Sequence, residues 1–139
     1  MAKYYVDTNI WLDLLESRNS FLKPYGEFAF QFFKKCLERK DLVLYSQIVL
    51  DELTLRHSLE DVEKHCFGLF QRTNLLEFVP AAEWQKNEAV RIALSRGVSK
   101  SDAVHAILAR DNNAVVITRD KHFNLLQDIA KSLSPEEVC

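Results

Sequence analysis

Four acidic residues lie where apolar, β-rich runs of the sequence give way to helical patterns. They are Asp7 in YYVDTNIW, Glu52 in SQIVLDEL, Asp102 in SKSDAVHAILA and Asp120 in VVITRDKHF. Carboxylates that are brought together from distant segments repel one another unless a cation neutralises them. If the fold gathers these four side chains, the cluster would imply a bound divalent metal.

The chemistry of such a cluster follows from its oxygen ligands. Carboxylates suit Mg²⁺ or Mn²⁺, which also bind water and phosphate oxygens. One ion can ionise an attacking water, and a second, about 4 Å away, can stabilise the leaving oxygen of a phosphodiester displacement. We expect Asp7 to be the central ligand, with Asp102 and Asp120 completing the metal shell directly or through waters. Glu52 is expected to bind metal or to orient the nucleophilic water.

Each acidic residue also has a purely structural explanation. Asp7 is placed to cap a first helix, Asp102 forms a capping box with Ser99, and Asp120 is placed to start a last helix. Glu52 alone is equally well an ordinary solvated residue on a helix. Only the order and placement of all four together favour a metal site.

Length and charge define the class of protein. The 139 residues fit one domain over 1–139, and 47% hydrophobic content is typical of a folded globular chain. The 18 basic and 20 acidic residues give a net charge of -2, which neither indicates nor excludes a nucleic-acid partner. Positive charge near the acidic cluster matters more than this sum.

The cysteines and the N-terminus indicate a cytoplasmic location. Cys36, Cys66 and Cys139 are far apart, odd in number and without zinc-site spacing, so a reducing compartment fits best. Cys36 and Cys66 fall on apolar helical faces and are expected in the core. The start MAKYYVDTN contains no signal peptide, and no window approaches the roughly 20 apolar residues of a membrane span.

The apolar pattern alternates between short strands and longer helices. We expect strands at 3–7, 42–45, 75–79 and 114–118, and a fifth, edge strand at 129–133. A first helix is expected to follow Thr8 or Asn9 and to run through Leu15, and further helices at 26–40, 46–55, 59–72, 82–96 and 99–110. A polar loop is expected at 18–24, a helix start at Asp120 and a terminal turn at 134–135. Thr8 or Asn9 should cap the first helix, Ser46 the third, and Gly97 should end the helix at 82–96.

This alternation predicts a three-layer α/β/α fold with a central, mostly parallel sheet of four or five strands. In such sheets, ligands bind outside the carboxyl ends of the strands, where the strand order reverses. Asp7 and Asp120 follow two strands directly, Glu52 lies about two turns into a helix, and Asp102 lies in a first helical turn. All four are therefore expected at one edge of the sheet.

The other residues with chemical potential give weaker signals. His105 follows Asp102 by about one turn and would share its edge, yet an isolated histidine is usually structural, so it ranks as a weak candidate. His57, His65 and His122 rank lower still. Trp11 and Trp84 are expected to lie in the core or at an interface.

With these residues in place, the sequence resembles the PIN-domain ribonucleases, the family that includes VapC-type toxins of toxin–antitoxin pairs. Four segments carry the resemblance in the expected order: DTNIWLDLL, SQIVLDELTLR, SKSDAVHAILAR and VVITRDKHFNLL. By this match the family's acidic quartet falls on Asp7, Glu52, Asp102 and Asp120. Asn9 and Thr118 are then the supporting polar residues. One departure is His122, because the position two after Asp120 is often acidic in the family.

The resemblance implies an Mg²⁺- or Mn²⁺-dependent endoribonuclease that acts on single-stranded or loop RNA. It also implies a homodimer and, for a toxin, an antitoxin protein partner. Lys100, Arg119 and Lys121 lie beside the matched motifs and are weak candidates for contacts with RNA phosphates.

Two other functions stay open at this stage. One is a non-catalytic PIN-like module that holds RNA or a protein and is indifferent to EDTA. The other is a phosphatase or phosphoacceptor domain with Asp7 as nucleophile, which is disfavoured because Asn9 stands where a second aspartate would be needed.

Overall fold

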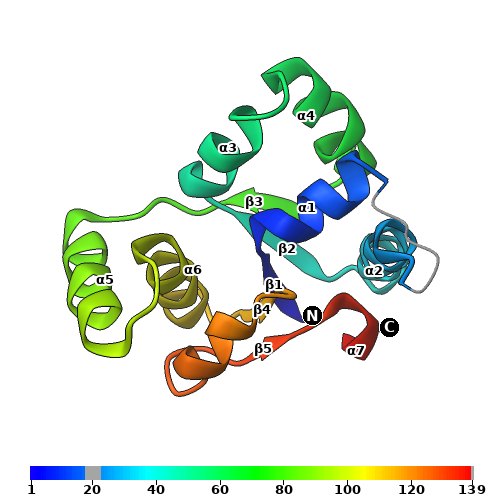
Figure 1. Cartoon of the computed structure of the whole chain (residues 1–139). Helices are drawn as coiled ribbons and strands as arrows, with labels where there is room; N and C mark the ends of the chain where they lie inside the picture. The colour runs from blue at the N-terminus through cyan, green and yellow to red at the C-terminus, as the bar shows by residue number, and fades with distance from the viewer. Residues whose placement is uncertain (18–22, 139) are drawn as a thin grey trace.

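A five-stranded, all-parallel sheet forms the centre of the molecule (Figure 1). The computed structural model describes residues 1–17 and 23–138. The strands are β1 (Lys3–Val6), β2 (Leu42–Tyr45), β3 (Leu76–Phe78), β4 (Val115–Ile117) and β5 (Ser132–Leu133). Their order is β3-β2-β1-β4-β5, so the predicted fifth strand is an edge strand, as expected.

The helices cover both faces of this sheet. The α-helices are α1 (Thr8–Leu15), α2 (Tyr25–Arg39), α3 (Gln47–Thr54), α4 (Leu59–His65), α5 (Glu83–Arg96), α6 (Lys100–Asp111) and α7 (Pro135–Val138). Two 3₁₀ helices, η1 (Phe67–Phe70) and η2 (Lys121–Leu126), complete the description. Figure 1 shows α5 and α6 on one side of the sheet and α1 and α2 on the other. This confirms the predicted three-layer α/β/α fold.

The central strands are mostly apolar, because both of their faces are covered. Tyr5 and Val6 of β1 and Val116 and Ile117 of β4 are completely buried. Tyr5 pairs with Val116 and Val6 with Ile117 in the parallel register. The carboxyl ends of β1 and β4 therefore lie side by side, which positions the residues that follow them.

The segment predicted as one helix at 59–72 is divided into α4 and η1. The break falls at Cys66, and Gly68 lies in η1 just after it, where glycine disfavours continuation of an α-helix by about 1 kcal/mol. The tighter 3₁₀ turn aligns residues three apart, so Phe67 and Phe70 both contact Trp11, with ring centroids 5.2 and 6.2 Å away. Packing on Trp11 therefore favours the shorter element.

The core contains most of the residues expected there. Trp11, Cys36 and Cys66 are buried. Trp84 is 60% exposed, so of its two predicted positions, in the core or at an interface, only the interface stays open. Most of the loop predicted at 18–24, and Cys139, lie outside the described residues.

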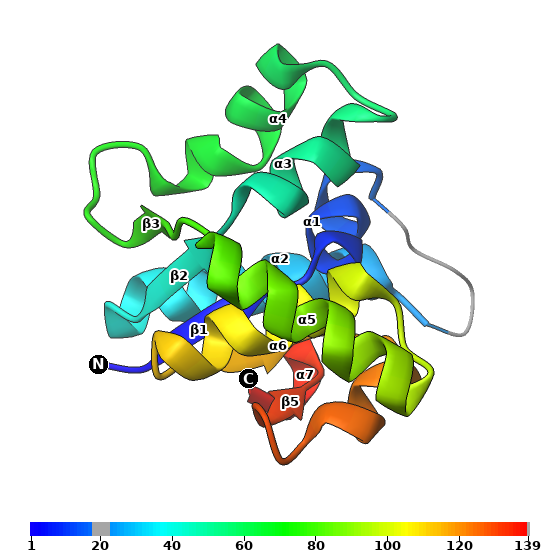
Figure 2. The ribbon, with the colours of Figure 1, turned by 90° about the vertical axis from the view of Figure 1, so that its left-hand side faces the viewer.

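The remaining features concern helix ends and helix length. Gly97 ends α5 with a left-handed φ of 70°, as predicted. Figures 1 and 2 both place α3 and α4 together at one end of the molecule. No helix in the described part of the chain is long and apolar enough to cross a membrane.

Candidate active site

The order of the strands reverses at β1. The chain passes from β1 to β2 on one side, and β4 later pairs on the other side of β1. A cleft of about 300 Å³ lies beyond the carboxyl ends of these strands. All four predicted acidic residues line this cleft. The complete lining is Asp7, Thr8, Asn9, Leu12, Glu52, Leu55, Asp102 and Asp120. The structure thus brings the quartet together at the type of location where α/β proteins bind ligands.

Asp7 stands at the centre of the strand–helix junction. It directly follows β1, and its backbone N–H donates to the carbonyl of Ile117 in β4 at 2.9 Å. One carboxylate oxygen, Oδ1, accepts from the Thr8 N–H at 2.8 Å, so Asp7 is the cap of α1. Capping by Thr8 or Asn9 was therefore a wrong prediction, because the chain is still extended at Asp7 and the helix starts at Thr8, one or two residues earlier than those caps require.

Thr118 fixes the second oxygen of Asp7. Its hydroxyl donates to Asp7 Oδ2 at 2.7 Å and accepts from the Asp120 N–H at 3.0 Å. Asp7 is only 6% exposed, and this burial is the main reason that its pKa is raised, against the opposing effects of His105 and the two hydrogen bonds. A carboxylate has about four lone-pair positions, so two hydrogen bonds leave acceptor capacity for a cation.

Glu52 reaches the same cleft from α3. Its Oε1 accepts from the Thr8 hydroxyl at 2.9 Å and lies 3.2 Å from Nε2 of His105. Burial opposes ionisation, but the hydrogen bond and charge of His105, with the Thr8 hydroxyl, outweigh it and lower the pKa of Glu52. Glu52 is therefore held as an ionised carboxylate.

His105 is the buried centre of this hydrogen-bond network, although the sequence indicated only a weak candidate. It is 1% exposed, its Nδ1 lies 2.6 Å from the Tyr5 hydroxyl, and its Nε2 lies 3.6 Å from Asp7 Oδ1. Burial disfavours its charge, but hydrogen bonding to Glu52 and the charges of Asp7, Glu52 and Asp102 together raise its pKa. His105 thus partly neutralises the two carboxylates beside it.

Ser46 belongs to the same network instead of capping α3 with its side chain. It occupies the cap position without a capping hydrogen bond, and its hydroxyl pairs with the Tyr5 hydroxyl at 2.6 Å. The chain Ser46–Tyr5–His105–Glu52 links β1, α3 and α6.

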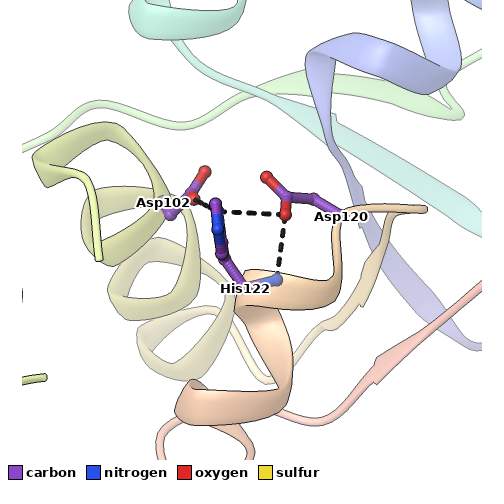
Figure 3. Close-up of side chains that lie close together, drawn as sticks. All are labelled: Asp102, Asp120 and His122. Atoms are coloured by element: carbon purple, nitrogen blue, oxygen red, sulfur yellow. Dashed lines mark hydrogen bonds and ion pairs between the residues drawn. The ribbon is translucent and has the colours of Figure 1, made fainter. Parts of the chain in front are cut away.

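A second group lies where α6 meets the end of β4. Figure 3 shows Asp102 of α6 beside Asp120 and His122 of the β4–η2 turn. His122 Nδ1 lies 3.2 Å from Asp120 Oδ1 and 3.8 Å from Asp102 Oδ2. One ligand atom from each of the three residues lies within 4.8 Å of the others. Among the His, Cys, Asp and Glu residues of 1–17 and 23–138, these three form the group whose ligand atoms are close enough to share one ion.

Local capping explains how these two aspartates are placed. The Asp102 N–H donates to Ser99 Oγ at 3.1 Å, as the predicted capping pattern requires. Asp120 Oδ1 accepts from the His122 N–H at 2.9 Å and so caps a 3₁₀ helix. One half of the predicted capping box at Ser99 and Asp102 is therefore present, Asp120 starts a helix as predicted, and both carboxylates remain at the cleft.

The electrostatics of this group favour a cation. Burial, followed by the charges of Asp120 and Asp7, raises the pKa of Asp102 to about 6. The Oδ1 of Asn9, on the same cleft, is buried with no hydrogen-bond partner among the described residues. The carboxylates of Asp102 and Asp120 and the imidazole of His122 form a donor set that fits a divalent ion such as Mg²⁺ or Mn²⁺, and the unpaired Asn9 oxygen lies on the same cleft.

The predicted basic residues are divided between surface and interior. Lys100 and Lys121 are exposed next to Asp102 and Asp120 in sequence. The guanidinium of Arg119 instead lies 3.2 Å from Asp13, 2.8 Å from Glu136 and 4.2 Å from the centre of the Tyr25 ring. The structure gives Arg119 these internal partners instead of a position for binding RNA.

Two residues were undervalued from the sequence. The signal for His122 was present, since it occupies a position that is often acidic in the family that the chain resembles. For His105 the helical spacing from Asp102 was visible, but its contact with Tyr5 spans 100 positions and is evident only in the fold.

Comparison with known proteins resolves the family. The model of the PIN domain matches residues 4–129. The chain belongs to the PIN-domain family. Among solved structures, this PIN domain is similar to VapBC2 from Rickettsia felis bound to a promoter DNA fragment, with 16% identity, a TM-score of 0.68 and coverage of 95% of this chain and 98% of that one.

Two further structures share the fold of this PIN domain. A toxin–antitoxin complex from Klebsiella pneumoniae has 20% identity and a TM-score of 0.64, covering 97% of this chain and 98% of that one. FitAcB from Neisseria gonorrhoeae has 20% identity and a TM-score of 0.64, covering 96% and 98%. No curated protein matches the sequence significantly. At these identities the likeness shows the fold alone.

Proposed function

We propose that this PIN domain is an Mg²⁺- or Mn²⁺-dependent endoribonuclease that hydrolyses phosphodiester bonds. The observation that carries the proposal is the convergence of Asp7, Glu52, Asp102 and Asp120 on one cleft at the reversal of strand order. When bound, the metal would supply a Lewis acid that ionises water and offsets phosphate charge. Membership in the PIN family supports this activity over other reactions of acidic sites.

The four acids have different surroundings, and this suggests different roles. Asp7 is buried and fixed at both oxygens, which suits a central ligand whose position does not vary. Asp102 and Asp120 would hold metal from the α6 side. Glu52 is ionised and held by Thr8 and His105, so we assign to it the orientation of the attacking water. Asn9 and Thr118 would support this arrangement.

The substrate is proposed to be single-stranded or loop RNA. A nucleic-acid strand that binds in an open cleft needs accessible phosphates and a flexible backbone, and unpaired RNA provides both. Lys100 and Lys121 are exposed beside the Asp102 and Asp120 ends of the cleft and would contact phosphates. Arg119 is not part of this proposal, because its guanidinium has internal partners.

We further propose a toxin of a toxin–antitoxin pair, acting in the cytoplasm as a homodimer. The support is that the similar structures include toxin–antitoxin complexes. Leu55 lines the cleft and is 84% exposed, so an antitoxin segment entering there would cover an apolar side chain as well as the acids. The odd number and wide spacing of Cys36, Cys66 and Cys139 fit a reducing compartment.

Adjacent acidic residues on α3 provide a matched test. Asp51 is exposed and bonded to Gln47, whereas Glu52 lines the cleft. With Mg²⁺ or Mn²⁺ and an unstructured RNA, we expect Glu52→Gln to reduce the cleavage rate by about 100-fold or more, within the range for a group that acts on the attacking nucleophile. Asp51→Asn should cleave like the wild type.

Cleavage by Glu52→Gln at the rate of the wild type and of Asp51→Asn would contradict the proposed role. RNA binding that is unchanged by EDTA, with no cleavage in any metal, would support instead the non-catalytic PIN-like binding module.

A further inference from the structure

His122 adds a nitrogen donor to a site that otherwise offers carboxylate oxygens. It lies two residues after Asp120, on the first turn of η2, and its ring turns back toward both aspartates (Figure 3). The Asp120 carboxylate fixes this turn by accepting the His122 backbone N–H at 2.9 Å. Asp120 therefore contacts His122 twice, at the backbone N–H and at the ring nitrogen Nδ1.

The distances suit shared coordination. Metal–ligand bonds of 2.0–2.1 Å in an octahedral ion place adjacent ligand atoms about 3 Å apart and opposite ones about 4 Å apart. Nδ1 lies 3.2 Å from Asp120 and 3.8 Å from Asp102, and the selected ligand atoms are within 4.8 Å of one another. The His122 side chain is 67% exposed, so its ring has open space in which to turn toward an ion.

The charge balance also fits. The carboxylates of the site already offset the charge of a divalent ion, and a neutral imidazole adds a bond without adding charge. The remaining positions would be available to water and to substrate oxygens. A carboxylate at position 122 would instead place a third negative charge beside Asp102 and Asp120, which lie 3.8 and 3.2 Å from the present imidazole nitrogen.

We propose that His122 Nδ1 is a direct ligand of the ion held by Asp102 and Asp120, and that it makes the site prefer Mn²⁺ to Mg²⁺. This inference rests on the proposed metal site. Mg²⁺ is hard, favours oxygen ligands and gives up its waters reluctantly, whereas imidazole suits ions of the first transition series. Mn²⁺ accepts both carboxylate and imidazole, so a mixed set of two oxygens and one nitrogen discriminates between the two ions.

The test measures metal binding in the absence of RNA. The dissociation constants for Mn²⁺ and Mg²⁺ are obtained by calorimetry or by competition, and pulsed electron paramagnetic resonance of bound Mn²⁺ reports whether a nitrogen nucleus is coupled to the metal. The variants are His122→Asp, which keeps a ligand at this position but removes the nitrogen, and His65→Gln. His65 is exposed on α4, outside the cleft, and is the matched histidine control.

We expect nitrogen coupling in the wild type and in His65→Gln, and its loss in His122→Asp. The ratio of the Mg²⁺ to the Mn²⁺ dissociation constant should fall by about tenfold in His122→Asp, within the range seen when the support of a metal ligand is removed. If the wild type binds Mn²⁺ without nitrogen coupling, or if His122→Asp keeps the wild-type ratio, the inference is wrong while the proposed nuclease stands. If no divalent ion binds to any folded variant, the proposed metal-dependent function itself fails.

Discussion

At the scale of single residues, structural and chemical roles coincide. Asp7 caps α1 and Asp120 caps η2, which are the ordinary explanations for an acid at these positions. The same hydrogen bonds hold each carboxylate at the cleft. Capping therefore does not compete with metal binding in this site, since it provides the fixed orientation that a ligand requires.

Asp102 should destabilise the protein when no metal is bound. Its pKa rises from 3.8 to about 6 on folding, so its contribution to stability is present below pH 4 and is lost as the pH rises through about 6. Asp102→Asn should therefore be more stable than the wild type in EDTA by about 1 kcal/mol at pH 7.5, allowing for solvent screening at the cleft. Its advantage should grow between about pH 4 and pH 6 and stay constant above that range.

Urea denaturation at several pH values measures this effect. The control variant is Asp51→Asn, on the exposed side of α3. Asp128→Asn would be unsuitable, because it also breaks the ion pair between Asp128 and Arg96. An Asp102→Asn protein that is less stable than the wild type in EDTA at pH 7.5 would show that Asp102 is not strained by its neighbours.

His105 should be important for stability as well as for position. His105→Ala removes a buried imidazole, leaves the buried Tyr5 hydroxyl without this partner and opens a cavity, which together cost about 3 kcal/mol. The exposed His65→Ala should change the free energy of unfolding by less than about 0.5 kcal/mol. Equal unfolding free energies for the two variants would contradict the network described for His105.

At the scale of elements, Arg119 connects the end of β4 to three helices. Its guanidinium contacts Asp13 of α1, Tyr25 of α2 and Glu136 of α7. Arg119→Ala should lower the free energy of unfolding by about 3 kcal/mol, because it leaves Asp13 buried without this partner. Lys121→Ala, two positions away and exposed, should leave stability unchanged in the same denaturation experiment. A stable Arg119→Ala protein would show that the other contacts suffice.

The sequence predicted elements well where local pattern decides them. The strand at 42–45 was placed with correct bounds, because LVLY is an apolar run covered on both faces. The division between α4 and η1 was missed, since it depends on the contact of Phe67 and Phe70 with the distant Trp11.

The position of the acidic residues could also be predicted from local pattern, but the hydrogen-bond network around His105 could not. Asp7 and Asp120 follow apolar strands, so their edge is implied by a parallel sheet. The role of His105 depends on Glu52, which is 53 positions away, and on Tyr5, which is 100 positions away. Such long-range pairs leave no local pattern in one sequence.

At the scale of the whole molecule, the cleft should couple metal binding to stability. Mn²⁺ at 100 times its dissociation constant should raise the free energy of unfolding by about 2.7 kcal/mol, and EDTA should reverse the gain. Asp102→Asn should gain much less from Mn²⁺ although it is the more stable protein in EDTA. Thermal unfolding with and without Mn²⁺ measures both effects, and an equal gain in the two proteins would place the ion elsewhere.

The most direct test of the central claim is cleavage of an unstructured, end-labelled RNA by the wild type and by Asp7→Asn. Circular dichroism should first establish that both proteins are folded. The wild type should cut the RNA internally with Mn²⁺ or Mg²⁺ and stop on addition of EDTA, and Asp7→Asn should not cut in either metal. Cleavage that persists in EDTA, or cleavage by Asp7→Asn at the wild-type rate, would contradict a metal-dependent ribonuclease built on these four acids.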